Sequence, residues 1–286
     1  MNIQWFPGHM AKTRRMLSEN IKMIDVVIEL LDARIPLSSR NPEIDTLLGT
    51  KPRVVLLNKA DLADPAVTNE WIKYYRDKGI ICLTAESKKG EGLNNVKARL
   101  REIMADKIER EKQKGRLLRP IKTMVVGIPN VGKSSFINKI AGKATANTGD
   151  KPGVTRNKQW IRINEEIELL DTPGILWPKF EDEKVGLNLA FTGAIKDDIL
   201  DIAEIAMHLM KRLSEIYPDQ LAQRYKLDKV TDMTGLELLE AAGKKRGCII
   251  SGGEIDYYRI SAIVLDEFRG GKIGRITLER PVEEGQ

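Results

Sequence analysis

The sequence is poor in cysteine, histidine and aromatic residues, and each shortage argues against a class of function. Its 286 residues hold two cysteines and two histidines, and 5% of them are aromatic. The two cysteines, Cys82 and Cys248, lie outside any metal-ligand spacing, so we expect reduced thiols and no zinc site. No apolar run approaches the ~20 residues of a transmembrane helix, and residues 1–9 do not resemble a signal peptide. These absences favour a cytoplasmic globular protein without a membrane anchor, and we expect it to be monomeric.

Positive charge is spread unevenly along the chain. Residues 1–180 carry 32 Lys and Arg against 21 Asp and Glu, a net +11, whereas residues 181–286 carry 15 against 20, a net −5. A basic half indicates either a nucleic-acid partner or an anionic membrane surface, with a merely soluble basic surface as the alternative. No lipidation motif supports the membrane. The basic stretch 107–122 is predicted to be a surface connector that either binds RNA or is a solvated linker.

Strand and helix patterns alternate over the first half of the chain. Apolar runs predict strands, and periodic patterns predict intervening helices, over residues 24–31, 53–57, 66–78, 80–83 and 93–108. This alternation predicts an α/β fold with a mostly parallel sheet, in which ligands gather at the carboxyl ends of the strands. Beyond residues 178–182 the patterns are helical. The sequence therefore predicts two domains, 1–180 and a smaller, mainly helical 181–286.

A phosphate-binding motif lies between a predicted strand and a predicted helix. Gly127–Ser135 fits the pattern G-x-x-x-x-G-K-[ST], in which backbone N–H groups and the following helix N-terminus face an anion. Lys133 is expected to reach the β and γ phosphates, and the Ser134 hydroxyl to hold Mg²⁺. The residues expected to contact the phosphates are Asn130, Val131, Gly132, Lys133, Ser134 and Ser135.

A second motif selects the base. Asn58–Asp61 has the pattern N-K-x-D and directly follows a predicted strand. The Asp61 carboxylate can accept from both N1–H and the exocyclic amine of guanine, which adenine does not supply together. This disfavours an ATP-using kinase. After the next strand, Glu86 and Ser87 replace the usual Ser-Ala of the loop whose backbone contacts the guanine carbonyl. A backbone contact survives such a side-chain change.

The switch elements come from the region after the phosphate loop. Asp171–Gly174 has the pattern D-x-x-G, in which Asp171 supports Mg²⁺ and the Gly174 N–H senses the γ-phosphate. Thr155 is expected to complete the Mg²⁺ shell, with Thr145 and Thr148 as alternatives. The base motif precedes the phosphate loop, which reverses the common GTPase order. Circular permutation is the simplest explanation, because cutting and rejoining the chain keeps each motif at its strand end.

With these motifs in place, the chain closely resembles the YlqF/RbgA family of circularly permuted GTPases. The resemblance rests on Trp5–Met10, Asp32–Pro36, Asn58–Asp61, Asp171–Pro178 and Lys245–Cys248. It implies a P-loop GTPase domain with a smaller C-terminal helical domain that contacts RNA. It also implies GTP hydrolysis stimulated by a large-subunit precursor and its rRNA, late in ribosome assembly. The alternative is a nucleotide-gated RNA-binding factor in which hydrolysis is incidental.

Catalysis requires a group that orients the attacking water. Ile175 occupies the place where Ras-like GTPases have a glutamine, so we expect slow intrinsic hydrolysis. His9 is our candidate for this task, because a neutral imidazole can orient water near pH 7; a structural role for His9 is the alternative. Asn130 matches the asparagine that coordinates K⁺ in potassium-activated GTPases, or it is a loop-capping amide. The expected cofactors are thus GTP or GDP, Mg²⁺ and, at Asn130, K⁺.

Overall fold

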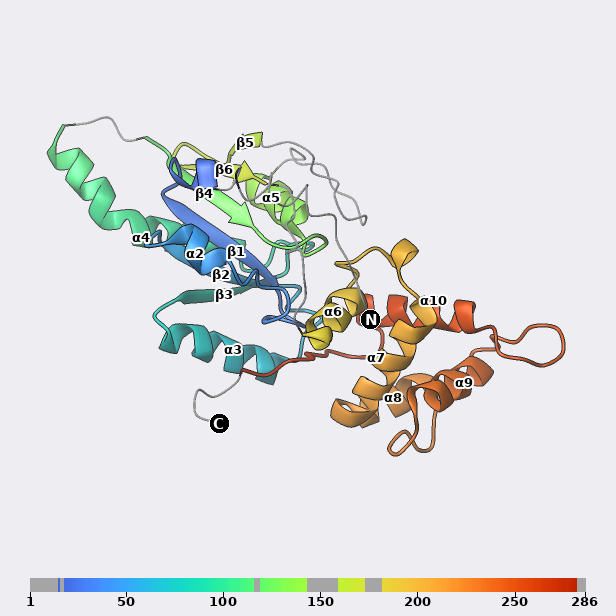
Figure 1. The fold of residues 1–286 in the computed structure, drawn as a ribbon. Coiled ribbons are helices and arrows are strands. Elements are labelled where there is room, and N and C mark those ends of the chain that lie inside the picture. Colours follow the sequence, from blue (N-terminus) through green and yellow to red (C-terminus); the bar gives the residue numbers. More distant parts are fainter. Residues whose placement is uncertain (1–14, 16–17, 116–118, 143–158, 173–181, 282–286) are drawn as a thin grey trace. The chain divides into compact units, whose positions relative to one another are not determined.

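The computed structural model describes residues 15, 18–115, 119–142, 159–172 and 182–281 (Figure 1). The chain divides into two compact units. The first comprises Met1–Glu181 together with Glu279–Gln286, and the second comprises Asp182–Leu278. The chain therefore leaves the first unit after Glu181 and returns to it at Glu279.

The first unit is built on a six-stranded sheet. Its strands are β1 (Val26–Asp32), β2 (Arg53–Asn58), β3 (Ile81–Ala85), β4 (Ile121–Val126), β5 (Gln159–Arg162) and β6 (Ile167–Asp171), in the order β3-β2-β1-β4-β6-β5. All pairs are parallel except β5 with β6, which confirms the predicted mostly parallel sheet. All seven residues of β1 are buried, as expected for a central strand covered on both faces.

The sheet register places the motif-bearing strand ends side by side. Asp32 lies opposite Asn58, and Asn58 lies opposite Ala85. On the other side of β1, Val125 of β4 lies opposite Asp171 of β6. The base motif, the loop after β3 and the switch aspartate therefore start from one edge of the sheet.

The helices of the first unit whose bounds lie within the described residues are α2 (Ile44–Leu48), α3 (Pro65–Asp77), α4 (Leu93–Gln113) and α5 (Lys133–Ala141). Trp71 and Tyr75 of α3 pack on Leu31, Val55 and Leu57 of the sheet and form an apolar cluster with them. α4 extends beyond the predicted end at residue 108. The prediction of a connector beginning at residue 107 was wrong, because Lys and Arg are good helix formers and continue the helix.

The second unit is helical. It contains α6 (Glu183–Phe191), the 3₁₀ turn η1 (Asp197–Ile199), α7 (Ile202–Ile216), α8 (Pro218–Tyr225), α9 (Gly235–Lys245) and α10 (Tyr257–Arg269). α7 is the central helix, with α9 and α10 packed on it. Thr234 and Glu237 form a capping box that starts α9. Among the helices that the structure describes, none is both long and apolar enough to cross a membrane.

Candidate nucleotide site

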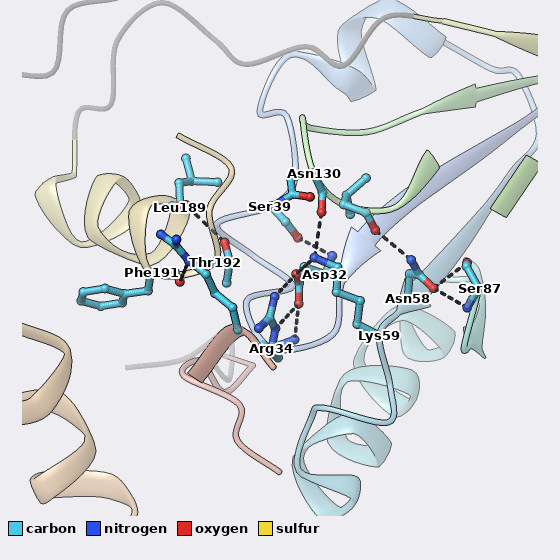
Figure 2. Close-up of polar contacts among 12 residues, drawn as sticks. Asp32, Arg34, Ser39, Asn58, Lys59, Ser87, Asn130, Leu189, Phe191 and Thr192 are labelled. Atoms are coloured by element: carbon cyan, nitrogen blue, oxygen red, sulfur yellow. Dashed lines mark hydrogen bonds and ion pairs between the residues drawn. The ribbon is translucent and has the colours of Figure 1, made fainter. Parts of the chain in front are cut away.

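Asn58 ties three loops together at the carboxyl ends of the strands. Its Nδ2 donates to the carbonyl oxygen of Val131 in the phosphate loop at 2.8 Å. Its Oδ1 accepts from the backbone N–H of Ser87 at 3.1 Å and from the Ser87 hydroxyl at 2.7 Å (Figure 2). Asn58 is 2% exposed, so these bonds satisfy a buried amide. The base motif, the phosphate loop and the loop after β3 are thereby held as one assembly.

Lys59 makes a second link from the base motif to the phosphate loop. Its Nζ donates to the Asn130 carbonyl oxygen at 2.7 Å and lies 3.0 Å from Oδ2 of Asp32 (Figure 2). Both Lys59 and Asn130 have positive φ angles, 59° and 57°, which are uncommon for residues other than glycine. The turn geometry needed to aim the ammonium group is therefore held in place by tertiary contacts.

The buried carboxylate of Asp32 forms ion pairs with two cationic side chains, Arg34 and Lys59. The Arg34 guanidinium donates to it from Nε at 2.9 Å and from Nη2 at 2.8 Å, in addition to the Lys59 contact. Burial alone would raise the pKa of Asp32, but the charges of Arg34 and Lys59 and the Arg34 hydrogen bonds hold it well below its usual range. Sequence reasoning assigned no role to Asp32 or Arg34, although their position at the end of the neighbouring strand was a usable sign.

The second glycine of the phosphate-loop motif, Gly132, cannot be replaced without strain. Gly132 has φ 100°, and a Cβ built on it would lie 2.4 Å from Nδ2 of Asn58. Lys133 begins α5 and is 7% exposed. Its Nζ donates to the carbonyl oxygen of Gly127 at 3.3 Å. Burial lowers the pKa of Lys133 to about 8, against the opposing charge of Asp171.

Asp171 is a buried carboxylate with capacity to bind a cation. It is 2% exposed, and its Oδ1 has no hydrogen-bond partner among the residues that the structure describes. Burial raises the pKa of Asp171, and the Lys133 charge and the Thr172 backbone oppose this only in part. Such a desolvated, under-bonded carboxylate beside the start of α5, where Ser134 lies, fits a divalent cation with oxygen ligands.

The base-reading loops have a defined backbone. Asp61 is half-buried in a turn in which the Leu62 N–H donates to the Lys59 carbonyl oxygen at 2.9 Å. Glu86 pairs through its backbone with Glu91, and its carboxylate lies 2.9 Å from the Lys89 ammonium. The Ser87 N–H and hydroxyl are both used in orienting Asn58, which the sequence did not predict.

Several predicted site residues lie outside the described part of the chain. These are His9, Thr155, Gly174 and Ile175. The structure thus brings together Asn58, Lys59, Ser87, Asn130, Val131, Gly132 and Lys133, with Asp171 near Lys133.

The chain is similar over its full length to GTPases of ribosome assembly. Residues 122–245 match the family described as 50S ribosome-binding GTPase. The whole chain is 51% identical to Ribosome biogenesis GTPase A of Bacillus cereus, covering 96% of that protein. It is 34% identical to Mitochondrial ribosome-associated GTPase 1 of Mus musculus, with 98% of this chain and 90% of that protein covered. The chain belongs to the ribosome biogenesis GTPase A family.

Solved structures of this family agree with the fold. The chain is similar to GNP-bound YlqF from T. maritima, with TM-score 0.66, 25% identity, and coverage of 95% of this chain and 99% of that one. A GDP-bound YlqF structure matches with TM-score 0.67 and 26% identity, covering 93% of this chain and 99% of that one. The chain is a circularly permuted, GTP-hydrolysing enzyme that binds guanine nucleotide and acts in ribosome biogenesis. A role in which hydrolysis is incidental is not favoured.

Proposed function

We propose that the protein acts late in assembly of the large ribosomal subunit and that the assembling particle stimulates its GTP hydrolysis. The observation that carries this proposal is the attachment of Asn58 and Lys59 to the phosphate loop. These bonds hold the base motif and the phosphate loop in register with each other. Rapid turnover then needs a group that orients the attacking water, which Ile175 cannot do, and we infer that this need is met when the assembling particle binds.

Each site residue has a role in this proposal. Asp61 accepts from the guanine edge, and Glu86 and Ser87 border the base. Lys133 and the backbone from Asn130 to Ser135 hold the phosphates, and the Gly174 N–H senses the γ-phosphate. Ser134, Asp171 and Thr155 would hold Mg²⁺, which would supply positive charge beside the phosphates. The under-bonded oxygen of Asp171 supports this assignment.

Two further roles concern the chemical step. His9 orients the attacking water, since Ile175 has no hydrogen-bonding group. Asn130 would hold K⁺, which would supply the positive charge that an arginine finger supplies in other GTPases. Turnover in matched K⁺ and Na⁺ buffers tests the second role, and equal rates would contradict it.

The rRNA contact is assigned to the helical unit. The basic groups Lys244–Arg246 and Arg269–Lys272 are the candidates for backbone contacts. Arg246 pairs with Glu267, and Arg269 pairs with Asp197, so these two arginines serve the unit's own packing. Lys244 and Lys245 are exposed, which makes them the better candidates.

The decisive experiment is GTP turnover with and without purified large-subunit precursors. We expect slow turnover alone and a large rise in kcat with the particle. His9→Ala is expected to lower stimulated turnover while GTP affinity stays within about twofold, because water orientation acts on the transition state alone. An absence of stimulation by any large-subunit particle would contradict the proposal, and unchanged turnover of His9→Ala would remove His9 from it.

A further inference from the structure

We propose that Glu279 is a positioning residue for the guanine-nucleotide site. Its carboxylate is 8% exposed and accepts from the backbone N–H of Leu37 at 2.8 Å and of Ser38 at 3.0 Å through Oε2. Its Oε1 accepts from the Ser38 hydroxyl. Charge-assisted bonds of this kind are stronger than neutral ones, and here three donors of one loop meet one anion. Glu279 therefore fixes the loop that follows β1.

The backbone around Glu279 is fixed as well. Its carbonyl oxygen accepts from the buried Trp71 indole Nε1 on α3 at 3.0 Å. The next residue, Arg280, pairs with Glu70 on the same helix, but both of these side chains are well exposed. The exposed ion pair contributes little to stability, whereas the hydrogen bond from the buried indole holds the segment at a fixed position on α3. The carboxylate is thus presented to the loop from a rigid base.

A chain of direct contacts runs from this loop to the base motif. The Ser39 hydroxyl accepts from the Asp32 N–H at 3.0 Å, and the Ile35 N–H donates to the Asp32 carbonyl at 2.9 Å. The Asp32 carboxylate in turn holds the Lys59 ammonium at 3.0 Å. Movement of residues 35–39 would therefore shift the carboxylate that aims Lys59 at the phosphate loop. This step rests on the proposed role of Lys59 in the nucleotide site.

The residues just before Glu279 are anchored in the helical unit. The Tyr217 hydroxyl bonds both the N–H and the carbonyl oxygen of Thr277, each at 3.2 Å. The Arg212 guanidinium donates to the Leu278 carbonyl oxygen at 3.3 Å. Thr277 and Leu278 are thus bound by residues of the helical unit, and the next residue, Glu279, is bound by residues of the first unit. A partner that displaces α7 has a short covalent route to the loop at Leu37 and Ser38.

The test is the rate of GDP dissociation from Glu279→Ala in the full chain. We expect dissociation to accelerate about fivefold or more, the lower end of ordinary coupling between sites. Glu70→Ala, which breaks the exposed pair beside it, is the matched control and should leave the rate unchanged. Glu279→Gln keeps an acceptor for the two N–H groups and should restore most of the wild-type rate.

A second readout separates positioning from mere stability. By reciprocity, a residue that tightens GDP binding is itself tightened by GDP. GDP should therefore slow hydrogen exchange at the Leu37 and Ser38 amides in the wild type, and this GDP-dependent protection should vanish in Glu279→Ala. A loss of stability alone would raise exchange equally with and without GDP.

Two results would overturn the proposal. One is an unchanged GDP dissociation rate in a folded Glu279→Ala protein; the other is protection of Leu37 and Ser38 by GDP that survives the substitution.

The variant Lys59→Ala distinguishes failure of the proposed nucleotide site from failure of the positioning role of Glu279. If Lys59→Ala binds GDP normally, the proposed site itself is wrong; if Lys59→Ala binds poorly while Glu279→Ala is normal, only the positioning role of Glu279 fails.

Discussion

Asp32 illustrates how one residue connects stability to nucleotide binding. Its carboxylate is buried together with Arg34, and it also holds Lys59. Taking charged groups out of water is costly, so such a cluster is stable only while each charge keeps its partner. Removing the carboxylate leaves two cations without their anion, and one of them is the lysine that contacts the phosphate loop.

We predict that Asp32→Asn lowers the free energy of unfolding of the first unit by about 3–5 kcal/mol at pH 7. The folded-state pKa of Asp32 is depressed, so its contribution is complete above the ordinary Asp pKa of about 4 and is lost as pH falls toward the folded value. The difference between wild type and Asp32→Asn should therefore shrink below about pH 4. Urea titrations between pH 3 and 7 measure this.

Tryptophan fluorescence is a suitable probe for those titrations. All four tryptophans, at positions 5, 71, 160 and 177, belong to the first unit. Glu70→Gln, at the exposed pair with Arg280, is the control and should change the unfolding free energy by well under 1 kcal/mol. A stability difference for Asp32→Asn that stays constant from pH 7 to pH 3 would contradict the ion-pair account.

A second prediction for a single residue concerns the space around Gly132. Gly132→Ala forces a side chain into a positive-φ position and against the Asn58 amide, at a cost of about 1–3 kcal/mol. We expect GDP affinity to fall about tenfold or more. Gly142→Ala is the control, because Gly142 also has positive φ but a Cβ there meets nothing within 4 Å. Equal affinities for the two variants, measured by calorimetry, would exclude a specific role for the Asn58 contact.

The motif residues could be recognised in the sequence, whereas the groups that hold them in place could not. Asn58–Asp61 and Gly127–Ser135 were recognisable because their chemistry is contained in a short local pattern. The bonds that orient them join distant positions: Asn58 with Val131, and Glu279 with Ser38. No local pattern encodes which backbone carbonyl a given amide will face, so these partners become visible only once the strands are aligned.

Whole elements were predictable in proportion to their length and burial. The strands with continuous apolar runs and the long helix α3 were predicted within a few residues of their bounds. The short helices α2, α6 and α8 were not predicted, because five to nine residues hold too few turns for a period to show. The end of α4 was misplaced because its last turns are charged on most faces.

The contact between α9 and α7 supplies a test at the element scale. Gly235 opens α9, and a Cβ there would lie 2.2 Å from the Met207 carbonyl oxygen on α7. Although alanine favours helices, we expect Gly235→Ala to destabilise the second unit by about 1–3 kcal/mol through this overlap. Leu236→Ala, at a 45%-exposed neighbour, should cost well under 1 kcal/mol. Thermal unfolding followed by far-ultraviolet circular dichroism measures both, and a stabilised Gly235→Ala would contradict the packing.

At the scale of the molecule, the helical unit is an insertion. The first unit is interrupted at residue 181 and resumed at residue 279, so two chain crossings connect the units. Each unit carries one cysteine: Cys82 in β3 and the fully buried Cys248 in the helical unit. Cys82 is half-buried, and burial raises the pKa of its thiol to about 12, so little reactive thiolate forms until the structure opens.

We predict that GDP slows thiol labelling of Cys82 but leaves labelling of Cys248 unchanged. A ligand stabilises the unit that binds it, by about 2.7 kcal/mol at 100 times its Kd, which is about a hundredfold in an opening equilibrium. Single-cysteine variants, Cys248→Ser and Cys82→Ser, isolate the two rates. Equal slowing at both thiols would show that the two units open together.

Because the chain returns to the first unit only at Glu279, the parts of the nucleotide site become available in a fixed order during translation. The base motif is translated first, the phosphate loop second, the helical unit third, and the segment that fixes the loop at Leu37 and Ser38 after all of them. Domains fold as they emerge, yet this contact joins positions more than 240 residues apart and forms only when both are available. A nascent chain thus carries every nucleotide-binding motif before it has Glu279, and the proposed positioning role of Glu279 implies that tight guanine-nucleotide binding is deferred until translation has passed residue 279.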